Sequence, residues 1–457
     1  EPNALLDISR DAARRQPNVR ATVQEVFDGM RAETQNRWPS LSFDINEVNN
    51  LLAPFFAAGF YYKTFMWPAS FWEKLYEPMI RRAAGLGRAA DAPDPDIYDK
   101  ANAFCDVLVI GSGPAGLMAA LTAARSGAKV ILVDENFAFG GRLISDWRTI
   151  EGKSGAEWVN SVVTELASLP NVRLMPRTTV FGAYDTGTFG AVERVADHVA
   201  VPGPGQPRQT LWHIVAKQSI VAQGSMERPI VFGNNDRPGV MLASAVRSYI
   251  NRFGVAPGRT AVVFSNNDEA ANTIDDLVRA GVTVAALVDT RPMLPPAIKA
   301  KARKHGIRVF EGAAVTDAVG GQRVSGARIA AAYGSINNVV CDLIAVSGGF
   351  NPNLQVTTHL GGRPQWQESL AAFVPGTLPK GMSVAGAANG SFSLAACLRE
   401  GARAGANAAA AGGFNNGSAS APAVEDELTE VSAFWHVDGA KHKAFVDQQN
   451  DVTAADV

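Results

Sequence analysis

A glycine-rich loop at 111–116, which reads Gly, Ser, Gly, Pro, Ala and Gly, constrains the fold of this chain more than any other feature. The apolar segment before it, 106–110, is typical of a strand buried on both faces of a parallel sheet. The Ala- and Leu-rich segment 114–126 predicts a helix, and 129–133 predicts the next strand. Together they form a βαβ unit of about 30 residues. This context predicts a Rossmann-type dinucleotide-binding fold.

The three glycines of the loop and the acids after the second strand have distinct physical roles. Gly111 permits the tight turn, Gly113 lets the backbone approach a pyrophosphate, and Gly116 lets the helix pack closely on the sheet. The helix N-terminus offers N–H groups and a partial positive charge to the phosphates. Asp134 or Glu135 can accept hydrogen bonds from the hydroxyls of the adenosine ribose. Because either acid would repel a 2′-phosphate, the pattern favours NAD or FAD over NADP.

Two later segments extend the predicted site. Gly140 and Gly141 leave room for a second approach of the backbone to the phosphates, directly after the strand that carries the acids. Arg142 either neutralises a phosphate or lies on the surface. Residues 171–180 predict a later strand whose main chain meets the edge of the adenine.

A second βαβ unit consists of a strand at 260–264, a helix at 269–280 and a strand at 283–288. Its loop, 265–270, has side chains where glycines would let phosphate approach the backbone. Asp268 and Glu269 favour the helix dipole but would repel a pyrophosphate. We therefore expect this domain to be retained structurally and to bind no nucleotide.

These patterns predict an α/β protein with an FAD/NAD(P)-binding Rossmann-type two-dinucleotide fold and an inserted second, degenerate nucleotide domain. The predicted domains are an N-terminal aromatic-rich region at 1–103, a dinucleotide-binding domain at 104–245 and 345–412, the inserted NAD(P)H-like domain at 246–344, and a linker at 413–457. Further buried strands are expected at 341–346 and 382–386, and a loose linker at 408–421. The aromatic-rich centre of the first region, 60–76, predicts a packed core or a surface that a partner covers.

One position distinguishes the two candidate dinucleotides. Two-dinucleotide flavoproteins usually place an aspartate near the start of their last helix, where it bonds the ribityl chain of FAD. The matching stretch here, 385–390, has Ala387 at that position. NAD has no ribityl chain, so the sequence favours NAD or a plain adenine nucleotide.

Composition argues against several classes of function. The net charge is −2, so no overall field attracts nucleic acid or an anionic membrane. The longest apolar run, 51–62, is shorter than the roughly 20 residues of a membrane-spanning helix, and no signal peptide is visible. Cys105, Cys341 and Cys397 form neither a redox pair nor a metal cluster. We therefore expect a cytoplasmic protein without membrane contact, with no metal site and no identifiable catalytic residue in this chain.

Several stretches outside the Rossmann motif carry a family resemblance. They are 1–4, 35–41, 58–65, 76–78, 235–241, 347–352 and 445–452. Through them the chain resembles the α subunit of heterotetrameric sarcosine oxidase over nearly its whole length. The resemblance implies a complex with β, γ and δ subunits that oxidises the N-methyl group of sarcosine. The products are glycine, hydrogen peroxide, and formaldehyde or a methylated folate.

The resemblance also implies where the cofactors lie. The α subunit would hold NAD⁺ tightly at the first Rossmann site, whereas FAD, FMN and the amine substrate would lie on the β subunit or be shared with it. Tetrahydrofolate would bind a C-terminal domain that follows this chain, just as a ferredoxin-like domain would precede it. The nucleotide-binding residues that the motif and the resemblance together predict are Gly111, Gly113, Pro114, Ala115, Gly116, Asp134, Glu135, Gly141, Arg142, Val180, Ala387, Phe392 and Ser393.

Three alternatives remain open at this point. The chain could be a free-standing FAD-dependent NAD(P)H oxidoreductase, against which the 265–270 loop and Ala387 argue. It could be the α subunit of a related oxidase that acts on an opine, proline or another secondary amine. It could also be a scaffold whose nucleotide is purely structural.

Overall fold

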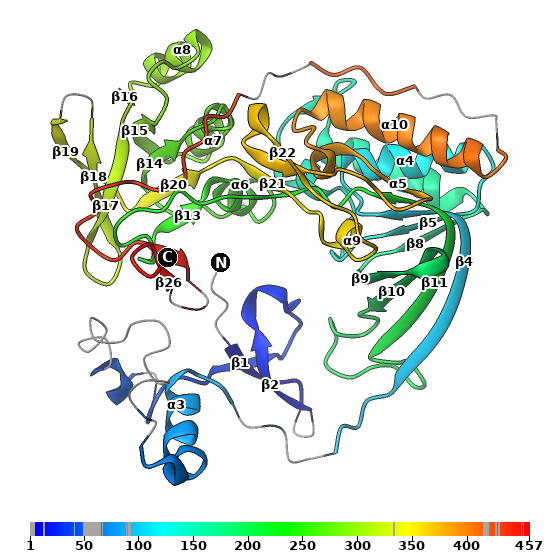
Figure 1. The fold of residues 1–457 in the computed structure, drawn as a ribbon, viewed down its shortest axis with the longest axis horizontal. Helices are drawn as coiled ribbons and strands as arrows, with labels where there is room; N and C mark the ends of the chain where they lie inside the picture. Colours follow the sequence, from blue (N-terminus) through cyan, green and yellow to red (C-terminus); the bar gives the residue numbers. More distant parts are fainter. Residues whose placement is uncertain are drawn as a thin grey trace. The chain divides into compact units, whose positions relative to one another are not determined.

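The chain divides into two compact units, which are described separately. The computed structural model describes residues 5–11, 14–40, 42–48, 65, 67–87, 89, 93–331, 334–414, 420–425, 427, 430–448, 450 and 452–457. One unit contains Glu1–Asp99, Arg194–Thr210 and Phe445–Val457, and the other contains Lys100–Glu193 and Leu211–Ala444. Figure 1 shows the elements of both, coloured along the sequence.

The first unit contains a small antiparallel sheet with strand order β2-β1-β3. Its elements are β1 (Leu5–Ser9), β2 (Arg15–Arg20), β3 (Arg31–Thr34), the short turns η1 (Ala21–Val23), η2 (Ile45–Val48), η4 (Ala69–Phe71) and η5 (Trp72–Tyr76), helix α3 (Glu77–Ala83), and the terminal pair β25 (Phe445–Asp447) and β26 (Val452–Thr453). Asp96, which is half-buried, accepts hydrogen bonds from Arg14 at 2.8 Å and Arg208 at 2.7 Å. These pairs tie segments that are far apart in sequence.

The predicted aromatic centre of this unit is only partly described. Residues 60–64 and 66 lie outside the described residues. Of the described ones, Phe71 lies 6.2 Å from Tyr76 between ring centroids, and both Phe71 and Trp67 are exposed. The described aromatics therefore do not form a buried core within this chain.

The second unit is built on a seven-stranded sheet with order β8-β5-β4-β11-β10-β9, in which β24 also pairs with β11. Its strands are β4 (Tyr98–Ile110), β5 (Val130–Val133), β8 (Val172–Met175), β9 (Thr178–Tyr184), β10 (Thr188–Glu193), β11 (Gln209–Val221) and β24 (Met382–Val384). β4, β5 and β8 run parallel, with Val107 opposite Val130 and Val130 opposite Val172. The predicted strand, helix and strand around the glycine loop are confirmed.

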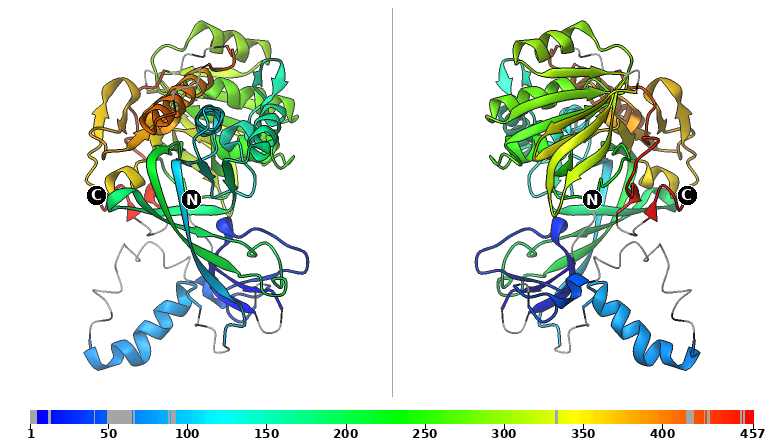
Figure 2. Two further views of the ribbon diagram at one scale, coloured as in Figure 1. Left: turned by 90° about the vertical axis from the view of Figure 1, so that its right-hand side faces the viewer. Right: turned by 90° about the vertical axis from the view of Figure 1, so that its left-hand side faces the viewer.

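Helices α4 (Pro114–Arg125), α5 (Gly155–Ser168) and α10 (Leu394–Ala411) share a hydrophobic core with β4 and β5. Figures 1 and 2 show α4 and α10 side by side. Close packing requires glycine here, because a Cβ on Gly405 would lie 2.3 Å from the backbone oxygen of Ala119. α10 contradicts the expected linker at 408–421, since the helix continues to Ala411. Alanine is the best helix former, and the Ala-rich end extends the helix.

A second sheet carries the second βαβ unit, with strand order β13-β20-β14-β15-β16 and parallel pairing throughout. Its strands are β13 (Val240–Leu242), β14 (Thr260–Ser265), β15 (Thr283–Asp289), β16 (Arg308–Glu311) and β20 (Leu343–Ser347), and its helices are α6 (Ala243–Asn251), α7 (Ala270–Arg279) and α8 (Pro296–Lys304). An antiparallel sheet follows α8 in the chain, made of β17 (Ala314–Gly320), β18 (Val324–Ala330) and β19 (Ile336–Val340). The second strand–helix–strand unit is thus present, while the exact domain boundaries stay a prediction.

The remaining described elements are short connections. They are η6 (Gly141–Ser145), β6 (Thr149–Ile150), β7 (Lys153–Ser154), η7 (Asp185–Gly187), β12 (Ser225–Glu227), β21 (Phe350–Pro352), α9 (Gln355–Thr358), β22 (Gln365–Gln367), η9 (Glu368–Leu370), β23 (Ala372–Val374) and η10 (Gly386–Asn389). Residues 171–180 contain the whole of β8 and the start of β9 rather than one strand. The reason is a turn at Pro176 and Arg177, where Arg177 has a φ of 53°. Within the described ranges, no helix combines the length and apolar character that crossing a membrane requires.

Candidate dinucleotide-binding site

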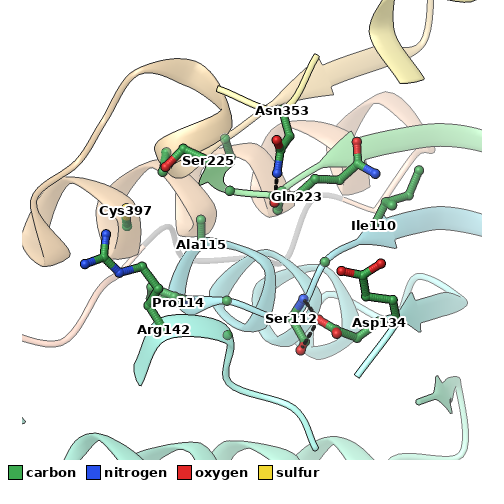
Figure 3. A pocket seen from close by; sticks show the side chains of 18 of the residues that line it. Ile110, Ser112, Pro114, Ala115, Asp134, Arg142, Gln223, Ser225, Asn353 and Cys397 are labelled. Atoms are coloured by element: carbon green, nitrogen blue, oxygen red, sulfur yellow. Dashed lines mark hydrogen bonds between the residues drawn. The ribbon is translucent and has the colours of Figure 1, made fainter. Parts of the chain in front are cut away.

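A cavity of about 480 Å³ lies where β4, β5 and β11 end and α4 begins. Ile110 and Val133, at the ends of β4 and β5, line it together with Ala222, which follows β11. In open α/β sheets, ligands bind in the crevice beyond the carboxyl ends of the strands. Figure 3 shows Arg142 and Cys397 on one side of this cavity and Asp134 on the other.

The structure brings most of the predicted nucleotide-binding residues into the walls of this one cavity. Those that line it are Gly111, Gly113, Pro114, Ala115, Asp134, Glu135, Gly141, Arg142, Val180, Ala387 and Phe392. Gly116 and Ser393 are not among the lining residues. Ser393 instead caps α10, because its hydroxyl accepts a hydrogen bond from the N–H of Ala396.

The glycine loop has the geometry that a phosphate requires. Gly111 has a φ of 99°, and a Cβ there would lie 2.4 Å from the backbone oxygen of Ala222. A Cβ on Gly116 would lie 1.8 Å from the backbone oxygen of Gly111, so Gly116 serves the turn itself. Next to Gly113 the space is open, and no side chain caps the helix that it begins. The first N–H groups of α4 are therefore available at a cavity with room for an anion.

Asp134 holds the glycine loop through hydrogen bonds to Ser112. Its Oδ2 accepts hydrogen bonds from the backbone N–H of Ser112 at 2.7 Å and from the Ser112 hydroxyl at 2.6 Å (Figure 3). Its Oδ1 accepts one from the N–H of Asn136 at 2.8 Å. The Asp134 side chain is buried, whereas Glu135 is exposed at the cavity wall. Of the two acids that the sequence left open, Glu135 is therefore more accessible to a ribose, and Asp134 positions the loop.

Arg142 carries positive charge at the opposite side of the cavity. Its guanidinium lies 4.8 Å from the ring centroid of Phe350 and pairs with Glu269 at 3.4 Å. Arg148 also lines the cavity, but its charge is balanced by Asp146 and by Glu427 at 2.6 Å. Arg142 thus lines the cavity with an exposed side chain, and its contact with a phosphate stays a prediction.

The cysteine in the cavity wall is not a redox centre in this structure. The Sγ of Cys397 donates to the backbone oxygen of Ser391 at 3.0 Å, and burial raises the pKa of its thiol to about 12. Burial also raises the pKa values of Cys105 and Cys341 to about 12, and all three cysteines are free. Protonated thiols are weak nucleophiles, so none is activated near neutral pH. The described part of the chain also holds no group of side chains suited to a metal ion.

Sequence reasoning missed the wall that closes the cavity opposite the glycine loop. It consists of Gln223, Gly224, Ser225, Met226, Asn353 and Gln355. The Asn353 side chain donates to the backbone oxygen of Gln223 at 3.0 Å, and its N–H donates to that of Gly224 at 3.0 Å. Residues 223–226 directly follow β11, so the rule that ligands meet the carboxyl ends of parallel strands could have identified them. Asn353 has no such signal, because its place depends on a contact across 130 residues.

Comparison with known proteins agrees with this fold. Residues 106–193 match the family of FAD dependent oxidoreductases. The L-proline dehydrogenase of P. horikoshii has a similar structure, with a TM-score of 0.54, 23% sequence identity, and coverage of 72% of this chain and 59% of that one. At this identity the likeness concerns the fold alone. The predicted FAD/NAD(P)-binding Rossmann-type fold is confirmed.

Two curated proteins are similar to far more of the sequence. The α subunit of sarcosine oxidase from Rhizobium meliloti is 49% identical over 460 residues, which cover 100% of this chain and 46% of that protein. The corresponding subunit from Corynebacterium sp. strain P-1 is 39% identical over 389 residues, which cover 82% of this chain and 40% of that protein. The chain thus spans slightly less than half the length of these relatives. It is homologous, over its full length, to the α subunits of sarcosine oxidase.

Proposed function

We propose that this chain is the NAD-binding portion of the α subunit of a sarcosine oxidase-type amine oxidoreductase. Two observations support this proposal. The sequence identity to a sarcosine oxidase α subunit extends over the whole chain, and the glycine loop borders an open cavity. The β, γ and δ subunits complete the enzyme. The amine is oxidised on flavins that belong to the β subunit or are shared with it.

The acids around the cavity support NAD over FAD. Among the described lining residues, the carboxylates are those of Asp134 and Glu135, which follow β5. At Ala387 the wall has no carboxylate for a ribityl chain. The nearby Glu400 accepts from the N–H of Gly386 at 2.8 Å and from the Ser391 hydroxyl at 2.7 Å, and it does not line the cavity. Glu135 would meet the adenosine ribose, and the first turn of α4 would meet the phosphates.

NAD⁺, when bound, supplies a nicotinamide that can accept a hydride, and we propose that it is held here without turnover. The residues of this chain bind and enclose it, with Arg142 balancing phosphate charge and Phe392 in the cavity wall. FAD is the second candidate occupant. The match of 106–193 to FAD dependent oxidoreductases favours it.

The test of the occupant is to denature the intact protein and identify the released nucleotide by chromatography and mass spectrometry. One NAD⁺ per copy of this chain supports the proposal. Release of FAD without any NAD⁺ would replace NAD by the second candidate. Release of no nucleotide would refute the binding role itself.

The test of the reaction uses the assembled protein with sarcosine. Oxidation would consume sarcosine, oxygen and water and yield glycine, formaldehyde and hydrogen peroxide, with the flavin passing two electrons to oxygen. Without oxygen, sarcosine should bleach the flavin spectrum faster than proline or an opine does. Faster bleaching by proline or an opine would assign the protein to a related secondary-amine oxidase. Faster bleaching by NADH or NADPH would restore the NAD(P)H oxidoreductase alternative.

A further inference from the structure

The second parallel sheet has a crevice of its own, and a distant segment of the chain lies across it. This segment, residues 430–437, is called the strap. It begins 19 positions after the end of α10 at Ala411, yet it contacts the loop 265–269, between the carboxyl end of β14 and the start of α7. In a nucleotide-binding βαβ unit, this is the place where the pyrophosphate meets the backbone.

The strap pairs with the loop through main-chain hydrogen bonds. The N–H of Asp268 donates to the backbone oxygen of Glu430 at 3.1 Å, and the N–H of Glu430 donates to the Asp268 carboxylate at 2.9 Å. The N–H of Ser432 donates to the backbone oxygen of Asn266 at 3.0 Å. Backbone groups of the loop thus bond peptide groups of the strap, where a nucleotide-binding loop would bond phosphate oxygens.

Side chains and a second anchor reinforce this pairing. Asn266 is fully buried, and its amide donates to the backbone oxygens of Ser432 at 2.7 Å and Phe434 at 3.3 Å. Further along, the N–H of Val231 donates to the backbone oxygen of Trp435 at 2.8 Å, and the N–H of Val437 donates to that of Val231 at 2.9 Å. Both ends of the strap are therefore attached to the domain.

The loop 265–269 has little open space beside it, and both of its acidic side chains form ion pairs. The cavity beside Asn267 and Val431 has a volume of about 20 Å³, enough for about one water molecule. Asp268 pairs with Arg291 at 2.7 Å, and Glu269 pairs with Arg247 at 2.7 Å. The acids that the sequence assigned to the helix dipole are thus also partners in ion pairs.

We propose that the strap is the resident ligand of the second crevice. A peptide main chain takes the place of the pyrophosphate, and Asn266 recognises it by donating to two strap carbonyl oxygens. The crevice is thereby closed to NADH and NADPH. This proposal does not depend on what occupies the cavity at the first glycine loop.

The test is hydrogen–deuterium exchange of the intact protein, followed by mass spectrometry of peptides that cover the strap. In Asn266→Ala, strap amides should exchange roughly tenfold faster, because two buried hydrogen bonds to the strap are lost. Asn267→Ala is the matched control. It removes a buried amide of the same loop, which donates to Ser347 and to Asn266 and accepts from the N–H of Glu269, and none of these partners belongs to the strap. It should leave strap exchange within about twofold of the parent.

Two results would overturn the proposal. One is that strap amides in the parent protein exchange as fast as those of an unstructured peptide. This measurement uses only the parent protein, so it does not depend on whether a variant folds. The other is a change in strap exchange on adding NADH or NADPH, which would make the strap a displaceable cover of a working nucleotide site. Peptides covering 111–116 are read in the same samples. A failure of nucleotide binding at the first loop is therefore seen separately.

Discussion

At the residue scale, the two neighbouring acids after β5 have different environments, although both match the same motif. Asp134 accepts three hydrogen bonds that hold Ser112 and Asn136, whereas Glu135 is exposed at the cavity. The fingerprint specifies an acid at the end of this strand, and both residues satisfy it. Only burial and hydrogen bonding distinguish the residue that positions the loop from the one that is exposed at the cavity.

Substitution of the two acids should therefore have different effects. Glu135→Ala should weaken nucleotide binding by about tenfold to a hundredfold, because a charged hydrogen bond contributes roughly 1.5–3 kcal/mol. Its melting temperature without nucleotide should fall less than that of Asp134→Ala, because Glu135 is exposed and Asp134 is buried. Asp134→Ala should lower both the affinity and the melting temperature, since Ser112 loses its partner. Calorimetric titration and thermal unfolding measure the two quantities, and equal melting temperatures for both variants would contradict this division.

A second pair of substitutions separates the glycines by their surroundings. In Gly113→Ala, the new methyl group enters open space, so the fold should be stable while phosphate is excluded from the backbone. In Gly116→Ala, the methyl group would lie 1.8 Å from the oxygen of Gly111 and should disrupt the turn. We expect the first variant to lose nucleotide at an unchanged denaturation midpoint and the second to lose both. Retention of nucleotide by Gly113→Ala would show that the phosphates do not lie there.

At the element scale, helix α10 positions the wall of the cavity through its contact with α4. Gly401 and Gly405 let the backbones approach, since a Cβ on either would lie 2.1 Å or 2.3 Å from a backbone oxygen of α4. Ala387, Phe392 and the α10 residues Leu394 and Cys397 then reach the cavity. An Ala-rich helix with glycines one turn apart is therefore a packing device and part of the site.

Gly405→Ala should destabilise the protein by roughly 1–3 kcal/mol, the usual cost of overpacking a tight contact. Gly412→Ala is the control, because it follows the helix and a Cβ there meets nothing closer than 3.3 Å. Urea denaturation followed by far-ultraviolet circular dichroism gives both free energies of unfolding. If Gly405→Ala proved as stable as the parent, the backbone of α10 at Gly405 could not lie as close to the backbone oxygen of Ala119 in α4 as described.

At the scale of the whole second unit, a buried ionic cluster links the segment after η6 to helix α6 and to the loop before α7. Asp146, on the connection after η6, pairs with Arg148 and with Arg247 of α6, and Arg247 also pairs with Glu269. Burial disfavours the charge of Asp146, but Arg148 and Arg247 outweigh this and lower its pKa. Burial likewise opposes the charge of Glu269, and Arg142 and Arg247 lower its pKa. The cluster connects the wall of the first cavity to the loop beneath the strap.

This cluster should make stability depend on acid pH. The pKa values of free aspartate and glutamate are about 4, and the pKa values of Asp146 and Glu269 in the folded protein are lower. As the pH falls, these groups therefore take up protons in the unfolded chain before they do so in the folded protein. The stabilisation is therefore fully present above the unfolded pKa and is lost as pH falls through the folded pKa. Denaturation at a series of pH values from about 6 to about 3 should show decreasing free energy of unfolding.

In the double variant Asp146→Asn, Glu269→Gln, the protein should be less stable at neutral pH, because, among the described acids, buried Arg247 keeps only Asp276 and Arg148 keeps only Glu427 as a partner. Its stability should also fall less steeply in acid than that of the parent. An unchanged slope would assign the acid dependence to other carboxylates. Glu165→Gln is a matched control, since its pair with Arg125 lies on the exposed surface.

The sequence by itself determined the βαβ units, the glycine loop and part of the cavity wall around it. These features are local: strand, turn and helix follow from residues within about 30 positions, and chain spacing places the acids at the next strand end. It also predicted, from the lost glycines of 265–270, that the second domain would bind no nucleotide. That absence stays a prediction until exchange and nucleotide release are measured.

Only the tertiary structure decided what replaces those glycines and what closes the first cavity. Asn266 and Ser432 are 166 residues apart, and Arg142 and Glu269 are 127 apart. No periodicity or propensity encodes such contacts, because they depend on which surfaces the packed sheets bring together. For the same reason the sequence could not predict which of Asp134 and Glu135 is buried, since burial is a property of the assembled sheet. Local chemistry specified the loop, and long-range packing specified its partners.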